Sequence, residues 1–400
     1  MDRNVLFHLT SGLFVGVKDP QCGLQQRALI AAELDDIVLF GQRGVARQPI
    51  LDEIKWLNRM GLGPTDTNVY MLSSDDVRAI TTNAPLSYSH ARRLLGKRPV
   101  DVYAEVSFDR MLYEHAKRHG FRINGHSPED SARANSKAYF QKCATDPALN
   151  IPDGMVVKRD EVPTALVQML ETCECVYLKP TDAATGQGHQ PFLKSVDDLE
   201  PVDERFEDWV LQECLDKRAD LSMQFTMKNG GVIEVHYTTQ TINTSGHHTG
   251  NGSAINLKKE VALEILHQGT KLLGDYYGFM KDGSGSIDVV LDRNGTVWLV
   301  EVNFRKTSPV YVIDLFKRLY GKVIYFDMQG FSVPNNITGN ELCTHFARVL
   351  YEQGAKQGFI PFCFLPQHNF CYGVVFAHDF DEYTRLHSMV GEAHARLAQL

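Results

Sequence analysis

Three side chains with hard oxygen donors, Asp288, Glu301 and Asn303, mark the part of this chain best suited to chemistry. The segment 286–305 alternates β-branched residues on both sides of Arg293-Asn294-Gly295, and Asn-Gly is the strongest short hairpin signal. Pairing across that turn would bring the three side chains together at the open end of a hairpin, with Glu301 and Asn303 on one face. Such oxygens suit Mg²⁺, which takes one or two carboxylates and leaves its other positions to water and phosphates. A surface hairpin with solvated acidic residues is the alternative that this spacing leaves open.

A second candidate site lies upstream, where the short apolar segment 176–180 ends in Lys179 and a proline. The glycine-containing loop 181–188 follows directly. A lysine at a strand end beside such a loop offers a point charge and free backbone amides to phosphates, so we predict that this loop lies over a triphosphate. Glycine and small residues also mark plain turns, which is the competing interpretation.

Other phosphate-binding motifs are missing from the sequence. It contains no G-x-x-x-x-G-K-[ST] and no kinase catalytic loop, and Gly186-Gln-Gly188 lacks the third glycine of a dinucleotide fingerprint. The absence of these motifs excludes the P-loop, protein-kinase and Rossmann folds as the way this chain binds a nucleotide.

Between these two sites the sequence predicts a linker and a hairpin. The run 209–215 is apolar and contains Glu213, so its backbone could contact the edge of an adenine, with Asp220 near a ribose. Strands over 221–227 and 231–241 would form the hairpin. The polar, glycine-rich stretch 243–253 is too long for a tight turn and is predicted to be a substrate-facing loop.

The elements that must position these residues follow two patterns. Strand and helix signals alternate in the first third of the chain, which predicts a parallel sheet with crossover helices. The end of the chain resembles a smaller α/β extension. The predicted strands are 36–40, 68–72, 99–103, 359–365 and 370–377, and the predicted helices are 49–59, 86–95, 108–120, 341–353 and 381–400.

Composition describes an ordinary globular protein of 400 residues with 43% hydrophobic and 22% charged residues. The net charge of -8 gives no general attraction to nucleic acid or anionic lipid, and no run approaches the length of a membrane span. The eight cysteines show neither zinc spacing nor disulfide density, so reduced thiols and a cytoplasmic location are expected. The first ten residues are predicted to form a strand rather than a signal peptide.

In this order, the motifs resemble the ATP-grasp superfamily, whose members join a carboxylate to a nucleophile through an acyl phosphate. The resemblance covers residues 135–305 and begins with Lys137 on a helix. Within the superfamily, Gln240, the run 245–251 and the run 278–305 are similar to the pheganomycin-type peptide ligase and to butirosin-type ligases that charge carrier proteins. The run Lys306-Thr-Ser-Pro309 departs from that subgroup.

The resemblance implies a role for each matching residue, with ATP and Mg²⁺ (or Mn²⁺) as cofactors. Lysines and the glycine loop would hold the nucleotide phosphates, the linker would contact adenine, and an arginine with a lysine would serve catalysis. The implied residues are Lys137, Lys179, Thr185, Gly186 and Gly188 for phosphates, Glu213 and Leu215 for adenine, Asp220 for ribose, Asp288, Glu301 and Asn303 for metal, Arg305 and Lys179 for catalysis, and His247, His248 and Arg305 for substrate.

The predicted organisation is an α/β (α+β) chain with an N-terminal parallel-sheet domain over 1–123, an ATP-grasp domain over 124–319 and an α/β extension over 320–400. Within the second domain, a nucleotide-covering lobe would span 135–212 and a catalytic lobe 213–319.

The predicted activity is that of an ADP-forming ligase that joins a small-molecule carboxylate to an amine such as an amino acid or peptide, in specialised metabolite or peptide biosynthesis. Three alternatives stay open: loading of a carrier-protein thiol, carboxylation or carboxylate phosphorylation, and nucleotide binding without catalysis. A homodimer is compatible with the sequence, whereas nucleic acid and membrane partners are not expected.

Overall fold

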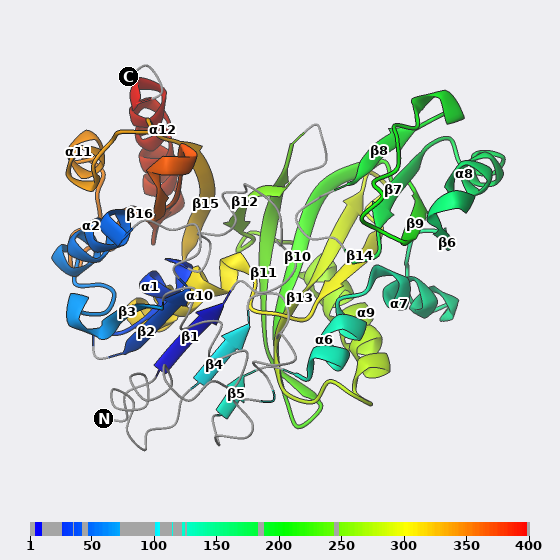
Figure 1. Ribbon diagram of the computed structural model, residues 1–400, viewed down its shortest axis with the longest axis horizontal. Helices are drawn as coiled ribbons and strands as arrows, with labels where there is room; N and C mark the ends of the chain where they lie inside the picture. Colours follow the sequence, from blue (N-terminus) through cyan, green and yellow to red (C-terminus); the bar gives the residue numbers. More distant parts are fainter. Residues whose placement is uncertain are drawn as a thin grey trace. The chain divides into compact units, whose positions relative to one another are not determined.

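The chain is represented by a computed structural model that describes residues 5–9, 26–34, 36–41, 47–72, 101–104, 114, 122–124, 126–182, 188–243 and 248–397. It divides into two compact units (Figure 1). Unit 1 comprises Met1–Pro128, Asn251–Ser253 and Lys306–Leu400, and unit 2 comprises Glu129–Gly250 and Ala254–Arg305. The predicted helix 86–95 and nearly all of the predicted helix 108–120 lie outside the described residues.

One sheet of unit 1 has five parallel strands in the order β3-β2-β1-β4-β5. This arrangement confirms the parallel sheet predicted from the alternating strand and helix signals. The strands are β1 (Val5–Leu9), β2 (Ile37–Gly41), β3 (Val69–Leu72), β4 (Asp101–Ala104) and β5 (Arg122–Asn124), and the helices of this region are α1 (Arg27–Ala31) and α2 (Arg47–Arg59).

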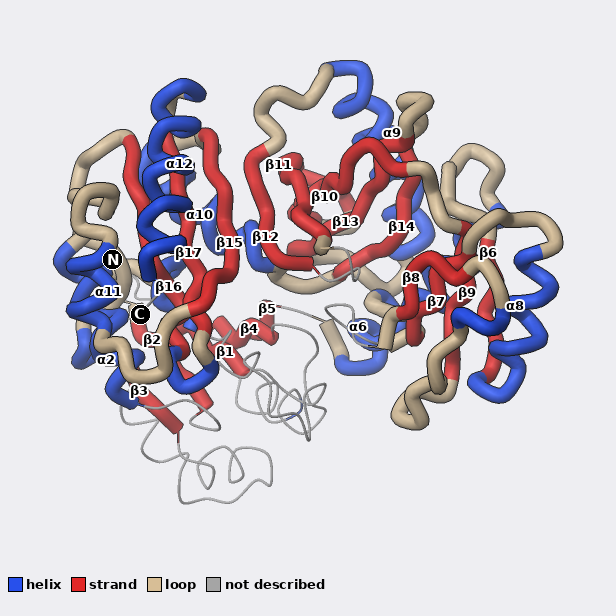
Figure 2. Tube along the Cα trace, turned by 90° about the horizontal axis from the view of Figure 1, so that it is seen from above, coloured by secondary structure: helices blue, strands red, loops and turns tan. Residues whose placement is uncertain are grey.

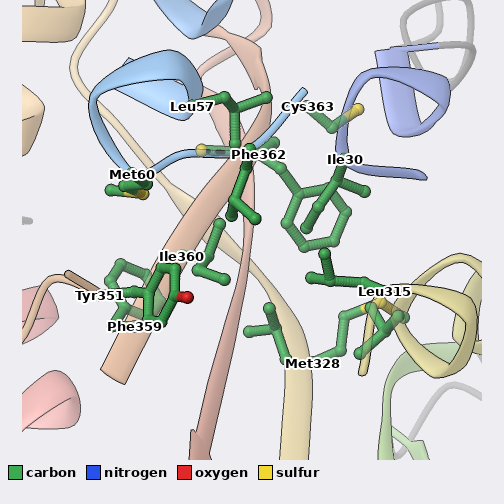
Figure 3. Close-up of a cluster of buried hydrophobic side chains, with 14 of the residues drawn as sticks. Ile30, Leu57, Met60, Leu315, Met328, Tyr351, Phe359, Ile360, Phe362 and Cys363 are labelled. Carbon is green, nitrogen blue, oxygen red and sulfur yellow. Dashed lines mark hydrogen bonds between the residues drawn. The ribbon is translucent and has the colours of Figure 1, made fainter. Parts of the chain in front are cut away.

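The rest of unit 1 is built on three antiparallel strands, β15 (Tyr325–Ser332), β17 (Phe370–Ala377) and β16 (Gln357–Leu365). Helix α12 (Phe380–Leu397) packs across these strands (Figure 2). Figure 3 shows how α1, α2, α10 (Ser308–Tyr320), β15 and β16 supply one apolar core. The core therefore joins segments from both ends of the sequence.

The predicted helix 341–353 is wrong in length, because α11 spans only Gly339–His345. Beyond it, the backbone pairs with β16: Phe359 donates its N–H to the carbonyl of Val349 at 2.7 Å, and Tyr351 donates to Phe359 at 2.9 Å. Burial of Val349 and Tyr351 in the core favours this extended pairing over further helical turns.

Unit 2 contains an antiparallel sheet in the order β14-β13-β10-β11-β12. Both predicted hairpins are present: β10 and β11 turn at Asn229 and Gly230, and β13 and β14 turn at Gly295, all three with positive φ. Helix α9 packs on one face so closely that a Cβ at Gly269 would lie 2.6 Å from Met223 Cε. The elements are β10 (Lys217–Lys228), β11 (Gly231–Ile242), β12 (His248–Ser253), α9 (Lys259–Tyr276), β13 (Gly283–Asp292) and β14 (Val297–Asn303).

A smaller antiparallel sheet in unit 2 has the order β6-β9-β7-β8, and helix α8 packs on one of its faces. The elements of this part are α7 (Lys137–Lys142), β6 (Gly154–Lys158), α8 (Val162–Leu170), β7 (Val176–Pro180), β8 (Gln190–Leu193) and β9 (Asp208–Glu213), and α6 (Pro128–Ala134) precedes them. Helix α7 contacts β6, β9 and β14 (Figure 1). It therefore links the smaller sheet to the larger one.

No helix among the described residues is both long and apolar enough to cross a membrane. The seven cysteines that the described segments contain are all free thiols.

Candidate functional site

The hairpin of β13 and β14 brings the three predicted metal ligands together. Asp288 pairs directly with Glu301, and Asn303 pairs with Ser286 two residues further along the same face. The Asn-Gly turn sets the pairing from Leu291 and Val297 to Val289 and Leu299. The predicted convergence of the three side chains is present at the open end of the hairpin.

A β-bulge in β14 is part of this arrangement. Val289 pairs with Leu299 and Asp288 pairs with Glu301, so Val300 has no partner of its own on β13. Leu299 and Val302 are buried in the core on either side of the bulge. The extra residue therefore turns Glu301 and Asn303 away from the apolar face and toward Asp288.

Two lysines from separate elements approach these carboxylates. Lys137, the first residue of α7 and only 3% exposed, places its Nζ 3.2 Å from Oε1 of Glu301. Lys179 on β7 donates to Oε1 of Gln212 at 2.9 Å and to the carbonyl of Val300 at 3.3 Å. Both ammonium groups are buried in the protein, where their charges are weakly screened.

Arg305 follows β14 and adds a third cation. Its Nη1 donates to Oδ1 of Asn135 at 3.0 Å, and the same oxygen accepts the backbone N–H of Phe304 at 3.0 Å. Asn135 lies just before α7 and thereby fixes both the backbone and the guanidinium at this end of the strand. Four polar side chains support the charged residues, and none of them was predicted from the sequence to have this role: Gln212, Gln240, Ser222 and Asn135.

The charges of this cluster shift one another's pKa values. Burial alone would raise the pKa of Glu301, but the cations of Lys137, Lys179 and Arg305 outweigh it and lower that pKa. Burial and the neighbouring charge of Glu301 raise the pKa of Asp288 above its ordinary range. Burial also lowers the pKa of Lys179 to about 8. The site thus keeps one carboxylate ionised beside a second whose charge it disfavours.

A cation bound between the carboxylates would relieve that disfavoured charge. Oδ1 of Asn303 is buried with no hydrogen-bond partner, and Asn303 is 5% exposed, so an acceptor oxygen is left beside the two carboxylates. No cluster of three His, Cys, Asp or Glu residues able to hold a metal occurs in the part of the chain that the structure describes. Two carboxylates and one amide oxygen fit Mg²⁺ shared with phosphates, because Mg²⁺ keeps most of its positions for water and phosphate oxygens.

The predicted adenine and ribose residues lie between the last residue of β9 and the first residues of β10. Oε1 of Glu213 accepts the N–H of Asp153 at 3.3 Å, and burial raises the pKa of Glu213. Asp220 lies on β10 and pairs with Lys217 at 2.8 Å. Leu215 lies in the connection between the two strands and is partly buried. Their contact with a nucleotide stays a prediction.

The loop residues are described only in part. Thr185, Gly186 and His247 lie outside the described residues. Gly188 has a φ of +69°, and a Cβ there would lie 3.0 Å from Cγ of Pro180, so glycine is required where the loop rejoins the sheet. The prediction of a loop over 243–253 is wrong for its second half, because His248 begins β12, where backbone pairing with β11 satisfies the polar main chain.

Comparison with solved structures shows that the chain has the fold of ATP-grasp enzymes. A biotin carboxylase from Campylobacter jejuni, solved as a β,γ-ATP complex, matches 96% of this chain and 89% of its own, with a TM-score of 0.62 and 11% identity. A carboxyaminoimidazole ribonucleotide synthase from Aspergillus clavatus, complexed with ATP, matches 99% of both chains, with a TM-score of 0.61 and 13% identity. The biotin carboxylase domain of the 2-oxoglutarate carboxylase from Hydrogenobacter thermophilus, solved with MgADP, ADP and bicarbonate, covers 94% of this chain and 87% of its own, with a TM-score of 0.59 and 12% identity.

No family model matches the sequence, and no curated protein is similar to it by sequence. The fold class predicted from the order of motifs is therefore confirmed by structure alone.

Proposed function

We propose that this protein is an ATP- and Mg²⁺-dependent ligase that activates a carboxylate as an acyl phosphate and joins it to an amine. The observation that carries the proposal is the cluster in unit 2, where three cations surround two paired carboxylates beside an amide oxygen without a partner. Solved proteins with the same fold contain ATP, ADP or MgADP, which supports a nucleotide as the ligand of this cluster. The resemblance to pheganomycin-type and butirosin-type ligases supports a role in peptide or specialised metabolite biosynthesis.

The residues perform the first step by offsetting repulsion between anions. A carboxylate oxygen of the substrate forms a bond to the γ-phosphorus of ATP while the bond to the bridging β–γ oxygen breaks, and ADP leaves. Lys137 and Lys179 would bind phosphate oxygens. Mg²⁺ held by Asp288, Glu301 and Asn303 would supply the charge that stabilises the leaving diphosphate. The two lysines and Arg305 would stabilise the charge of the transition state more strongly than exposed cations could, because they are buried and their positions are fixed before the reaction.

In the second step, the amine nitrogen bonds to the acyl carbon, the bond from that carbon to the phosphate oxygen breaks, and phosphate departs. Arg305, held by Asn135, would stabilise the negative oxygen of the tetrahedral intermediate. The amine would attack in its neutral form, and the proton of the resulting ammonium would pass to the departing phosphate. The loop around Gly188 would exclude water from the hydrolytically fragile acyl phosphate.

The products test this function directly. Purified protein with ATP and Mg²⁺ should release ADP and phosphate only when a suitable acid and amine are both present, and a screen of carboxylate and amine libraries would identify them. Release of AMP and pyrophosphate would contradict the proposal. The Asp288→Asn variant is the control for contaminating ATPase activity.

A second candidate is activation of bicarbonate, which is favoured by the solved carboxylase that holds a bicarbonate anion. The same assay separates the two functions. Labelled bicarbonate should enter an acid-labile product if the chain is a carboxylase, whereas a ligase for amino acids or peptides should leave the label in solution.

A further inference from the structure

The carboxylate of Asp288 is held unequally at its two oxygens. Oδ1 accepts hydrogen bonds from Oγ of Ser222 and from Nε2 of Gln240, each at 3.0 Å. Oδ2 accepts from Nδ2 of Asn303, also at 3.0 Å. An ionised carboxylate has about two acceptor positions on each oxygen, so two donors fill Oδ1 and one position remains on Oδ2.

The donors to Oδ1 come from two neighbouring strands in fixed register. Ser222 on β10 lies directly opposite Asp288 on β13. Gln240 lies on β11, two residues beyond Thr238, which pairs with Ser222. The side chain of Gln240 therefore crosses the width of β10 to reach Asp288. This distance requires the length of a glutamine side chain, because the shorter asparagine would not span it.

A buried polar network fixes the Ser222 hydroxyl in turn. Nε2 of Gln224 donates to Oγ of Ser222 at 2.9 Å and approaches Oγ1 of Thr238 at 3.3 Å. All three residues are at most 3% exposed. Because the hydroxyl accepts from Gln224, its own proton is free to point at a carboxylate or carbonyl oxygen, and Oδ1 of Asp288 is nearer than the carbonyl of Ile287 at 3.3 Å.

We propose that Gln240 and Ser222 are positioning residues that occupy Oδ1 of Asp288, so that Asp288 presents Oδ2 to a divalent cation as a one-oxygen ligand. Oδ2 lies on the side of Asn303, whose own Oδ1 has no partner. Donors behind a metal carboxylate fix its orientation, and their removal commonly costs 10–100-fold in metal affinity. This inference rests on the proposed function of the same cluster and adds to it how the ligand is oriented.

The test is a direct measurement of cation binding. Gln240→Met keeps the length of the side chain and removes the donor. We expect the Kd for Mn²⁺, measured by electron paramagnetic resonance in the presence of ADP, to rise about 10- to 100-fold in this variant. The Kd for ADP in EDTA should stay within a factor of two or so of the wild-type value, since Gln240 contacts no predicted nucleotide residue.

The matched control is Thr241→Met, which introduces the same side chain at the adjacent, exposed position of β11. It should leave both constants unchanged. An unchanged Mn²⁺ affinity in Gln240→Met, or an equal loss of ADP affinity in EDTA, would overturn the inference.

Ser222→Ala provides an independent variant, with its melting temperature as the check on folding, and it should also weaken Mn²⁺ binding. A wild-type protein that binds no Mn²⁺ in the presence of ADP would refute the proposed function instead. Wild-type binding that both variants retain would refute only the positioning role.

Discussion

Two glutamates, one in each compact unit, lie in opposite electrostatic surroundings. Glu53 on α2 is fully buried, and its two oxygens accept the backbone N–H groups of Cys363 at 2.8 Å and Phe364 at 2.9 Å. Burial raises its pKa to about 8 despite these hydrogen bonds. Glu301 has a cation 3.2 Å away, and its pKa is lowered.

The difference separates a structural carboxyl group from a candidate functional one. The carboxyl of Glu53 is fixed to the strand β16 and can become neutral without losing its role as an acceptor. Glu301 is kept ionised by lysines that have been buried at a cost in desolvation. Packing does not require buried charges with this desolvation cost, so the charged cluster in unit 2 is the better candidate for chemistry.

The largest effect should come from neutralising the charged cluster. Glu301→Gln, and separately Asp288→Asn, should lower ATP turnover at least about 10³-fold, because a metal charge worth several kcal/mol is removed with little change in shape. Steady-state ADP release measures this loss. The control is Glu53→Gln, which should turn over ATP like the wild type. Wild-type activity in Glu301→Gln or Asp288→Asn would contradict the assignment of these residues as metal ligands.

The next effect concerns the structural carboxyl. Glu53→Leu should destabilise unit 1 by about 2–6 kcal/mol, because two buried backbone N–H groups lose their acceptor at about 1–3 kcal/mol each. Hydrogen exchange at the amides of Cys363 and Phe364 should accelerate accordingly, while exchange in β13 should not. Faster exchange in both strands would show that the two regions do not respond separately.

A smaller effect is expected for the lysine that we propose to bind phosphate. Lys179→Ala should weaken ATP binding about 10- to 100-fold, since a charge-assisted hydrogen bond contributes about 1.5–3 kcal/mol. Isothermal titration with a non-hydrolysable ATP analogue measures the change. Lys194→Ala, at an exposed position past the end of β8, is the control, and an unaltered dissociation constant in Lys179→Ala would remove this lysine from the nucleotide site.

The smallest effect, taken per pH unit, is a dependence of stability on pH. The pKa of Glu53 in the folded protein, about 8, lies above its ordinary value of 4.5, so the folded state holds a proton that the unfolded state has released between these values. The free energy of unfolding should therefore fall as pH rises through this interval, by about 1.4 kcal/mol per unit, and should level off above pH 8. Urea unfolding should show a flatter profile for Glu53→Gln, and identical slopes would contradict the raised pKa.

The contrast also explains what the sequence could predict. The hairpin that carries Asp288 and Glu301 follows from local signals, because an Asn-Gly turn between two alternating segments predicts it. The bulge at Val300, which places Glu301 opposite Asp288, has no such signal in the sequence. Glu53 was not recognised, since its acceptor role depends on β16, which lies 310 residues later in the chain. Ser222 and Gln240 were missed as supports for a similar reason: their strands looked ordinary until the register placed both side chains behind one carboxylate.

The unpaired residue Val300 carries a consequence for how this protein can change over evolutionary time. If Val300 were paired instead of bulged, it would lie opposite Asp288, and Glu301 would lie opposite Ile287 on the apolar side of the sheet. A single-codon deletion of Val300 would close the bulge and keep Glu301 opposite Asp288, whereas the same deletion at Val302 would place Asn303 opposite Ile287 on the apolar side. This strand can therefore lose a residue at the bulge but not beyond it.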